Sequence, residues 1–193
     1  MASPQQDLFT DGAKSGGNSR GQEQRTLEYR CTVLPEWIDY NGHMSEAYYV
    51  LAFGFATDAV MESLGMGPQY RQETGNSLYT VEAHVRYLSE TGEGAPLTIT
   101  TTVAGAGAKK LHLAHEMRIG QADDDGAASV GTASAGAANA GTLIATEELL
   151  ALHVNSTSGR TAPFPEQIAA NFGNHQLAAN AEPPDWVGRS VSL

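Results

Sequence analysis

Hydrophobic and polar residues alternate along several stretches of the chain, and this two-residue period is typical of half-buried β-strands. The alternation is clean in residues 26–33 and returns in residues 77–88. Residues 96–103 are rich in β-branched side chains, and residues 110–119 carry apolar side chains on one face. Residues 142–154 predict a fifth strand, although their length leaves a helix possible for part of them.

Residues 45–64 change to the three- and four-residue spacing of a helix, and Gly65 provides a stop. The apolar positions that recur at this spacing are Tyr48, Leu51, Ala52, Phe55, Ala59 and Val60. Much of the helix circumference is apolar, which favours a helix buried by a surrounding sheet. A strand, a long helix and then four strands predict an α+β fold in which an antiparallel sheet packs on one central helix.

The remaining segments flank or interrupt this domain, which we place at residues 26–157. Residues 1–25 are polar and rich in Gly, Ser and Gln, so we expect a disordered leader. Residues 120–141 consist almost entirely of small and polar residues and predict a flexible low-complexity loop. Residues 158–193 predict a C-terminal helix, at about 166–178, and a Pro-rich tail.

The charge balance restricts the function. Eleven Lys and Arg residues against 22 Asp and Glu give a net charge of −11, which argues against nucleic-acid binding because that function needs a basic surface. The single cysteine, Cys31, excludes an intramolecular disulfide and fits a reducing compartment. We find no signal-peptide pattern and no stretch apolar enough to span a bilayer, so we expect a cytoplasmic protein without a membrane partner.

Polar residues crowd into one short segment. In PEWIDYNGHMSEAYY, residues 35–49, the side chains of Asp39, Asn41 and His43 lie between aromatic residues just before the predicted helix. A carboxylate there can activate water, while the unpaired N–H groups of the first helical turn can bind a developing negative charge. Asp and Asn are also common turn and N-cap residues, so a simple turn before the helix is the alternative.

Three segments carry a family resemblance. EWIDYNGHMSEAYY, LYTVEAHVRYLSETGEGAPL and KKLHLAHEM resemble the hotdog-fold acyl-CoA thioesterases, over about residues 27–155. Within that family, the overall likeness and the tail APFP…PPDWVGR resemble the betainyl-CoA thioesterases of bacterial carnitine degradation, some of which are domains fused to a carnitine dehydrogenase. The resemblance implies hydrolysis of betainyl-CoA to glycine betaine and CoA, beside a carnitine dehydrogenase.

The resemblance also implies an architecture and a set of catalytic residues. A curved sheet would wrap the long helix, and a homodimer or a tetramer of dimers would hold active sites between subunits. The usual catalytic group of the family is the acidic residue before the helix, here Asp39, and plant acyl-carrier-protein thioesterases add an Asn, a His and a more distant Glu. The positions that match this pattern are Asp39, Asn41, His43 and Glu90. Whether Asp39 or Glu90 acts as base or nucleophile stays open at this point.

Thioester hydrolysis needs an activated water or nucleophile, stabilisation of an oxyanion and a leaving thiolate. Since thiols ionise near pH ~8.5, the thiolate leaves readily and no strong general acid is required. The helix start next to NGHM would supply oxyanion donors, Gly42 would let the backbone approach closely, and Asn41 would orient water or the carbonyl. We expect no cofactor besides the CoA thioester substrate, and no metal, because His112 and His115 face opposite ways on a strand.

Further residues are candidates for substrate binding. Aromatic faces attract quaternary ammonium groups such as the betainyl group, although core packing would explain the same residues. The aromatic candidates are Trp37, Tyr40, Tyr48, Tyr49, Tyr79 and Tyr87. Lys109 and Lys110 could hold the CoA phosphates or be ordinary strand-end charges, and Glu82 could bind substrate or belong to a polar strand face. We expect His115 to be a satisfied core histidine.

Three other functions stay open. The same fold could bind acyl-CoA without catalysis, or it could hydrolyse a short-chain, fatty or aromatic acyl-CoA. A hotdog dehydratase, in which a His and an acid remove water from a 3-hydroxyacyl chain, is the third. The spacing of Asp39 and Asn41 is not the pairing expected of that enzyme.

Overall fold

The computed structural model describes residues 26–119, 130–133, 141–173, 175 and 183–188. Its elements in chain order are β1 (Thr26–Thr32), the 3-10 helix η1 (Pro35–Trp37), α1 (Glu46–Ser63), α2 (Pro68–Thr74), β2 (Asn76–Tyr87), β3 (Pro96–Ala106), β4 (Lys110–Ile119), β5 (Val130–Ala133), β6 (Thr142–Asn155), β7 (Arg160–Thr161) and α3 (Glu166–Phe172). The long helix and the five strands that the sequence predicts are all present.

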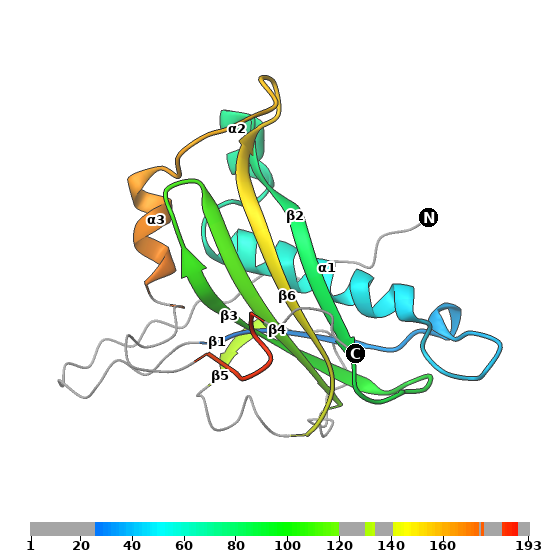
Figure 1. Ribbon diagram of the computed structural model, residues 1–193. Coiled ribbons are helices and arrows are strands. Elements are labelled where there is room, and N and C mark those ends of the chain that lie inside the picture. The colour runs from blue at the N-terminus through cyan, green and yellow to red at the C-terminus, as the bar shows by residue number, and fades with distance from the viewer. Residues whose placement is uncertain (1–25, 120–129, 134–140, 174, 176–182, 189–193) are drawn as a thin grey trace.

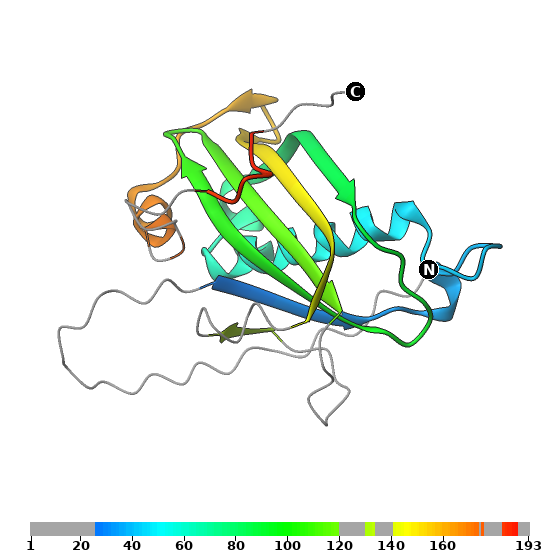
Figure 2. The ribbon, with the colours of Figure 1, turned by 60° about the horizontal axis from the view of Figure 1, so that its bottom comes forward.

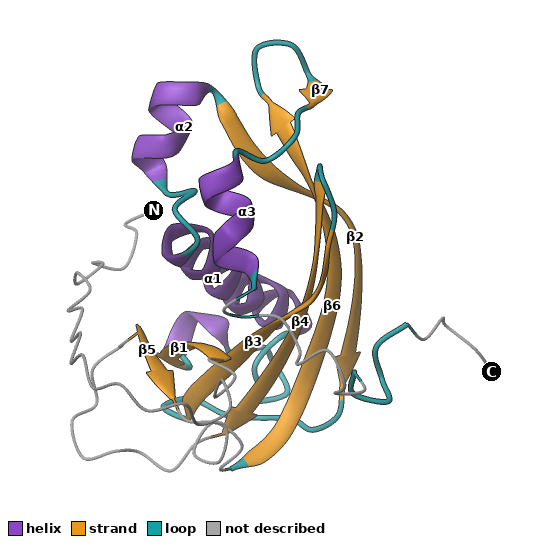
Figure 3. Cartoon of the chain, turned by 90° about the vertical axis from the view of Figure 1, so that its left-hand side faces the viewer, coloured by secondary structure: helices purple, strands orange, loops and turns teal. Residues whose placement is uncertain are grey.

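The strands form one antiparallel sheet in the order β2-β6-β4-β3-β1-β5, and β7 pairs with the end of β6. The sheet curves around α1, and α2 and α3 lie on the same concave side (Figures 1 and 3). The β2 strand forms one edge of this sheet. The arrangement confirms the predicted α+β fold, in which an antiparallel sheet packs on one central helix.

The face of α1 that meets the sheet differs from the predicted one. The buried residues of α1 are Tyr49, Ala52, Phe53, Ala56 and Val60. Leu51, which we expected to face inward, is 41% exposed, and Val50 beside it is 46% exposed. Because apolar residues surround most of the helix, their spacing cannot decide which side the sheet covers. The open side of α1 therefore carries apolar residues that this chain leaves uncovered.

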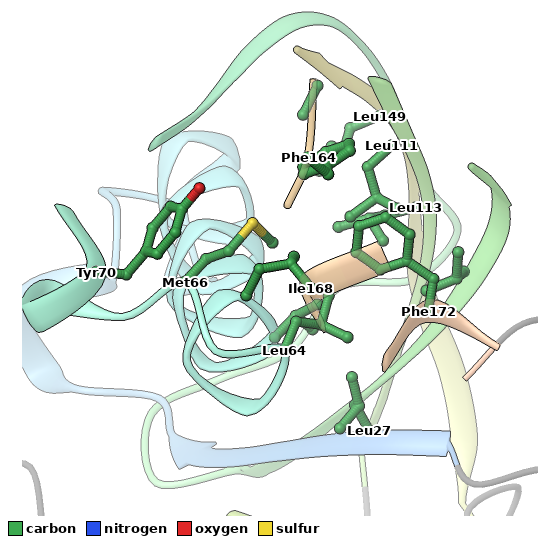
Figure 4. Packing of buried hydrophobic residues seen from close by; sticks show 13 residues of the cluster. Leu27, Leu64, Met66, Tyr70, Leu111, Leu113, Leu149, Phe164, Ile168 and Phe172 are labelled. Atoms are coloured by element: carbon green, nitrogen blue, oxygen red, sulfur yellow. The ribbon is translucent and has the colours of Figure 1, made fainter. Parts of the chain in front are cut away.

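Two groups of buried residues fill the space between α1 and the sheet. The distal core, shown in part in Figure 4, surrounds the C-terminal end of α1 and comprises Leu27, Val60, Leu64, Met66, Tyr70, Val103, Leu111, Leu113, Leu149, Ala151, Phe164, Ile168 and Phe172. The proximal core surrounds the N-terminal half of α1 and comprises Val33, Trp37, Met44, Tyr49, Ala52, Phe53, Ala56, Leu97, Ile99, Met117, Ile144 and Ala145.

Several predicted boundaries change. The segment 120–141 was expected to be a loop throughout, but residues 130–133 form β5 and pair with β1 through backbone hydrogen bonds. The whole of β6 is strand, so no part of it is helical. The C-terminal helix α3 ends at Phe172. The predicted leader, residues 1–25, lies outside the described residues.

The loop before α1 and the segment after β2 lie at the same end of the molecule (Figure 2). A hydrogen bond of 2.8 Å from the N–H of Met44 to the carbonyl of Thr91 joins them. This is the proximal end, where the predicted catalytic residues lie. In the described part of the chain no helix is long and apolar enough to cross a membrane.

Candidate active site

Residues 38–44 form a tight hairpin-like loop in front of α1. Ile38 and Met44 make an isolated antiparallel bridge, and the N–H of Asp39 donates to the carbonyl of His43 at 2.9 Å. The N–H of Gly42 donates to the carbonyl of Asp39 at 3.0 Å, and Gly42 has a φ of +83°, which favours glycine. A Cβ at Gly42 would meet nothing within 4 Å, so the turn conformation rather than a close approach requires this glycine.

The carboxylate of Asp39 organises this turn. Its Oδ1 accepts a hydrogen bond of 2.7 Å from the backbone N–H of Asn41, and its Oδ2 lies 3.5 Å from the Asn41 side-chain nitrogen. The structure therefore contains the turn that was the alternative interpretation, and Asp39 and Asn41 are in contact within it. Asp39 is only half-buried, so lone pairs on both carboxylate oxygens remain open to water or a substrate.

His43 and Glu90 meet although they are distant in sequence. The Nδ1 of His43 lies 3.3 Å from Oε2 of Glu90, with side-chain exposures of 44% and 71%. The N–H of Asp39 bonds the carbonyl of His43, so the two residues face each other across the loop, and the Met44 bond to Thr91 holds Glu90 next to this loop. The structure brings together all four predicted catalytic residues on one exposed surface, and it links Asp39 to His43 through the backbone.

The helix start supplies different N–H donors from those expected. Within NGHM, the N–H groups of Asn41, Gly42 and Met44 all donate inside the protein. The α1 helix begins at Glu46, and its N-cap Ser45 makes no side-chain capping bond. The first N–H groups of a helix have no intrahelical acceptor, so those of Glu46 and Ala47 are the available donors. They point out at the positive end of the helix dipole, where an oxyanion is stabilised.

The predicted aromatic cage divides into separate pairs. Trp37 is buried and stacks on Tyr48 with ring centroids 5.6 Å apart, so each covers a face of the other. Tyr49 is buried and meets Tyr87 edge to face at 5.4 Å. Tyr40 is 96% exposed at the tip of the loop. Trp37, Tyr48 and Tyr49 are therefore packing residues of the proximal end, and Tyr87 offers the exposed ring.

Four other predicted binding residues lie toward the distal end. Tyr79 and Lys110 both pair with Leu152 of β6, whereas Tyr87 pairs with Ala145. Seven residues of strand separate these positions, or roughly 25 Å. Lys109 and Lys110 are exposed, and Glu82 lies exposed on the edge strand, 3.8 Å from His84. A single chain therefore does not bring these residues to Asp39.

A cavity of about 770 Å³ opens at this distal end. The C-terminal half of α1, α2 and the start of β2 line it, and its lining includes Asp58, Met61, Arg71, Leu78 and Tyr79. Burial raises the pKa of the Asp58 carboxyl above its ordinary value. In one chain the cavity is separated from Asp39 by the length of α1, about 27 Å.

Sequence reasoning missed one buried acidic residue, Glu147. It lies in β6 opposite Val85 of β2 and His115 of β4, on the concave face. The sequence holds a signal for it, because Glu147 and Glu148 are neighbours inside an apolar strand and one of them must face the core. His115 is fully buried and bonded at both ring nitrogens, which confirms it as a satisfied core histidine.

The HxxH spacing places its two histidines on opposite faces of the sheet. His115 faces α1, whereas His112 contacts Glu148 at 2.7 Å, and Glu148 in turn accepts the backbone N–H of Gly188 at 2.7 Å. Among the residues that the structure describes, no three His, Cys, Asp or Glu side chains are grouped to hold a metal ion.

Comparison with known proteins assigns the family. The family model of the thioesterase-like superfamily matches residues 33–172. The chain belongs to the thioesterase-like superfamily. A relative of this thioesterase-like protein, betainyl-CoA thioesterase of Pseudomonas aeruginosa, is 36% identical over 166 residues, which cover 86% of this chain and 93% of the relative.

A second relative is a fused protein. L-carnitine dehydrogenase/betainyl-CoA thioesterase of Agrobacterium fabrum is 33% identical over 155 residues, which are 80% of this chain and 28% of the relative. This chain therefore spans less than a third of the length of that fused relative.

Solved structures share the fold. A hypothetical protein from Staphylococcus aureus in complex with CoA superposes with a TM-score of 0.73 at 24% identity, covering 91% of this chain and 99% of the other. A 1,4-dihydroxy-2-naphthoyl-CoA thioesterase from Synechocystis superposes with a TM-score of 0.60 at 17% identity, covering 77% and 96%. These similarities confirm the hotdog architecture that the sequence predicts.

Proposed function

We propose that this protein hydrolyses betainyl-CoA to glycine betaine and CoA. The observation that carries the proposal is a half-buried carboxylate, Asp39, beside an uncapped helix start in a chain that belongs to the thioesterase-like superfamily. The P. aeruginosa relative is named for this activity, and the match to this chain covers 93% of that relative. The acidic net charge of −11 favours a cationic acyl group over an anionic one.

Asp39 is the group to which we assign the chemistry. Its carboxylate activates a water molecule, or attacks directly, at the thioester carbonyl. The N–H groups of Glu46 and Ala47 bind the oxyanion that forms, and the CoA thiolate leaves without a strong acid. Glu90 is more exposed than Asp39 and is held by His43, so we assign this pair to positioning the loop.

We propose that the working form is a dimer joined along β2. The β2 strand is an edge of the sheet and exposes Tyr79, Val81 and Tyr87, and Leu88 directly after it is exposed too. A long edge strand with exposed apolar residues is a template for pairing. Antiparallel pairing about a two-fold axis near its centre would set the distal end of one chain beside the proximal end of the other. The cavity, Tyr79, Glu82 and the two lysines would then approach Asp39 of the second copy.

The dimer has a direct test in solution. Sedimentation equilibrium of the purified protein is expected to give twice the monomer mass of 20.4 kDa, or four times that mass if dimers assemble further. Val81→Lys places a charge on the edge and is expected to shift the protein toward monomer. A wild-type monomer at micromolar concentration would contradict the proposal.

We also propose that the protein works next to a carnitine dehydrogenase in the cytoplasm. The fused relatives carry both activities in their names. The single cysteine fits a reducing compartment, and burial raises the pKa of the Cys31 thiol to about 12, so it is an inert packing residue. A copy of this chain that co-purifies with a carnitine dehydrogenase would support the association.

The function is tested by thiol release from a panel of betainyl-, short-chain, fatty and aromatic CoA esters. Betainyl-CoA is expected to give the highest kcat/KM, and Asp39→Asn is expected to reduce kcat about 1,000-fold, since it removes the group that activates water. Glu36→Gln, an exposed carboxylate on η1, is the matched control and should keep full activity.

Each other outcome selects an alternative. Saturable binding of CoA esters without thiol release would identify a non-catalytic binder. Preference for another ester would change the acyl group but not the reaction. Hydration of a crotonyl-type thioester would identify a dehydratase, and full activity of Asp39→Asn would overturn the role of Asp39.

A further inference from the structure

Glu147 is a buried carboxyl group without a hydrogen-bond partner in the described chain. Glu147 is 4% exposed. Its Oε2 atom lies 3.9 Å from Nε2 of His115, and this distance is too long for a hydrogen bond. Burial raises the pKa of Glu147 to about 7. A buried carboxylate is costly unless it is paired, so the charged form of Glu147 needs a cation that the described residues do not supply.

His115 cannot be that cation. The hydroxyl of Thr57 donates to the carbonyl of Phe53 at 3.0 Å, so its oxygen accepts from Nε2–H of His115 at 3.2 Å. Nδ1 of His115 then accepts from the Thr101 hydroxyl at 2.7 Å. Both ring nitrogens are therefore used by the neutral form, and burial lowers the pKa of His115 to about 3.

The other groups near Glu147 are aromatic or acidic. Tyr87 is two residues from Val85, the β2 partner of Glu147, and therefore lies on the same concave face. The pKa of Tyr87 is raised first by burial and then by the negative charges of Glu46 and Glu147. No Lys or Arg of the described chain forms an ion pair with either carboxylate.

This group of residues adjoins the candidate active site. Tyr49 packs edge to face on Tyr87, and its hydroxyl donates to the carbonyl of Ser89 at 3.2 Å. Ser89 precedes Glu90, which contacts His43. In a betainyl group one methylene separates the ammonium nitrogen from the thioester carbonyl. The residues that recognise the ammonium must therefore lie near the reacting carbonyl. Tyr87 meets this need, because its ring contacts Tyr49 in the first turn of α1 and its hydroxyl is affected by the charges of both Glu46 and Glu147.

We propose that Glu147 is the specificity-determining residue for a quaternary ammonium acyl group, and that the exposed ring of Tyr87 supplies the aromatic face beside it. The inference rests on the proposed function and names its recognition element. A bound trimethylammonium group would be the missing countercharge, so binding would favour the ionised carboxylate and release its proton to solvent. Buried Tyr49 would hold the Tyr87 ring in place. A neutral acyl group of equal shape would find a protonated Glu147 and gain nothing from it.

The test compares betainyl-CoA with 3,3-dimethylbutanoyl-CoA, in which carbon replaces the ammonium nitrogen. Glu147→Gln keeps the size of the protonated acid but cannot ionise, so the fold should be retained. The variant is expected to lose about 100-fold in kcat/KM for betainyl-CoA and less than about threefold for the neutral ester. Glu148→Gln, on the same strand but on the opposite face, is the matched control and should preserve the preference.

A second readout is independent of turnover. Tetramethylammonium binding, measured by titration calorimetry, should be lost in Glu147→Gln and should release a proton in the wild type near pH 7. Equal losses on both esters, or a preserved preference for betainyl-CoA in the variant, would overturn the inference. If the wild type cleaves only neutral esters, the proposed substrate is wrong. In that case, tetramethylammonium binding that depends on Glu147 would still support a cation site. A lack of such binding would overturn the cation site as well.

Discussion

The two ends of the molecule treat their buried polar groups in opposite ways. In the distal core, His153 is fully buried and both ring nitrogens are bonded. Its Nδ1 donates to the carbonyl of Ala162 at 2.8 Å, so its Nε2 accepts from the Tyr70 hydroxyl at 2.8 Å. Phe164 stacks on the ring with centroids 4.6 Å apart. The buried polar groups of His153 and Tyr70 are therefore hydrogen-bonded, as a stable protein interior requires.

The proximal end leaves buried polar groups without partners. Among described residues, Thr91 Oγ1, Thr146 Oγ1 and Arg118 Nε are fully covered and have no hydrogen-bond partner. All three residues lie near the β2–β6 end that carries the candidate site, and Glu147 lies there too. Unsatisfied buried groups cost stability, so their concentration at one end indicates that function rather than stability shaped it. The following four predictions separate the two ends.

The largest effect is expected in the distal core. His153→Ala removes two hydrogen bonds and a stacked ring, so it should lower the free energy of unfolding by about 4 kcal/mol. The folded fraction should keep the wild-type kcat, because the His153 side chain bonds Tyr70 and Ala162, which are not candidate site residues, and its backbone bond to Lys109 does not depend on the side chain. Urea unfolding and thiol release on the same samples measure both. If His153→Ala lost turnover but kept the wild-type stability, the proposed contrast between the distal and proximal ends would be wrong.

The next effect is a pH dependence at Glu147. The unfolded state ionises above pH 4.5, whereas the folded state holds the proton up to about pH 7, so stability falls as pH rises through this range. Glu147→Gln should remove that loss and be more stable than wild type at pH 8 by about 3 kcal/mol. At pH 4 the two should be equal. His115, whose pKa is lowered to about 3, destabilises the fold as pH falls below 6.5, but it does so equally in both proteins.

Unfolding midpoints of both proteins from pH 4 to pH 8 measure this difference. A constant offset across the range would mean that Glu147 is not held protonated. Glu147 would then resemble the hydrogen-bonded polar groups at the distal end.

A smaller effect is expected at the contact between His43 and Glu90. Glu90→Gln should reduce kcat about 10-fold, because a partly exposed pair that positions the loop contributes modestly. His43→Asn should have a similar effect, and the double variant should be little worse than either one. A loss of about 1,000-fold for Glu90→Gln alone would make Glu90 the base in place of Asp39.

The smallest effect is expected at Thr146. Thr146→Val replaces an unpaired buried hydroxyl by a methyl group of nearly the same size, so it should stabilise the protein by at most about 1 kcal/mol. Thermal unfolding in parallel with Thr101→Val is the control. The Thr101 hydroxyl donates to His115, and its removal should destabilise. Destabilisation by Thr146→Val would show that this hydroxyl has a partner.

The regular features of the chain were predictable from the sequence. Alternation in residues 77–88 specified a strand, because a half-buried strand needs period two, and the crowding of Asp39, Asn41 and His43 pointed to the candidate site. The inward face of α1 was not predictable, because apolar residues surround the helix. The separation of Tyr79 from Tyr87 follows from the length of their predicted strand, but the β-bulge between Thr80 and Glu82, which puts the two rings on opposite faces, was not predictable.

The sequence by itself determined the elements, their order and the segment that holds the candidate catalytic residues, because these depend on local periodicity and residue type. Only the tertiary structure decided which polar side chains share a buried space. It brought His43 to Glu90, left the N–H groups of Glu46 and Ala47 available, and gave Glu147 no countercharge among the described residues. Those outcomes depend on which strand lies under which turn of α1, and register between distant segments is set by packing rather than by any local pattern.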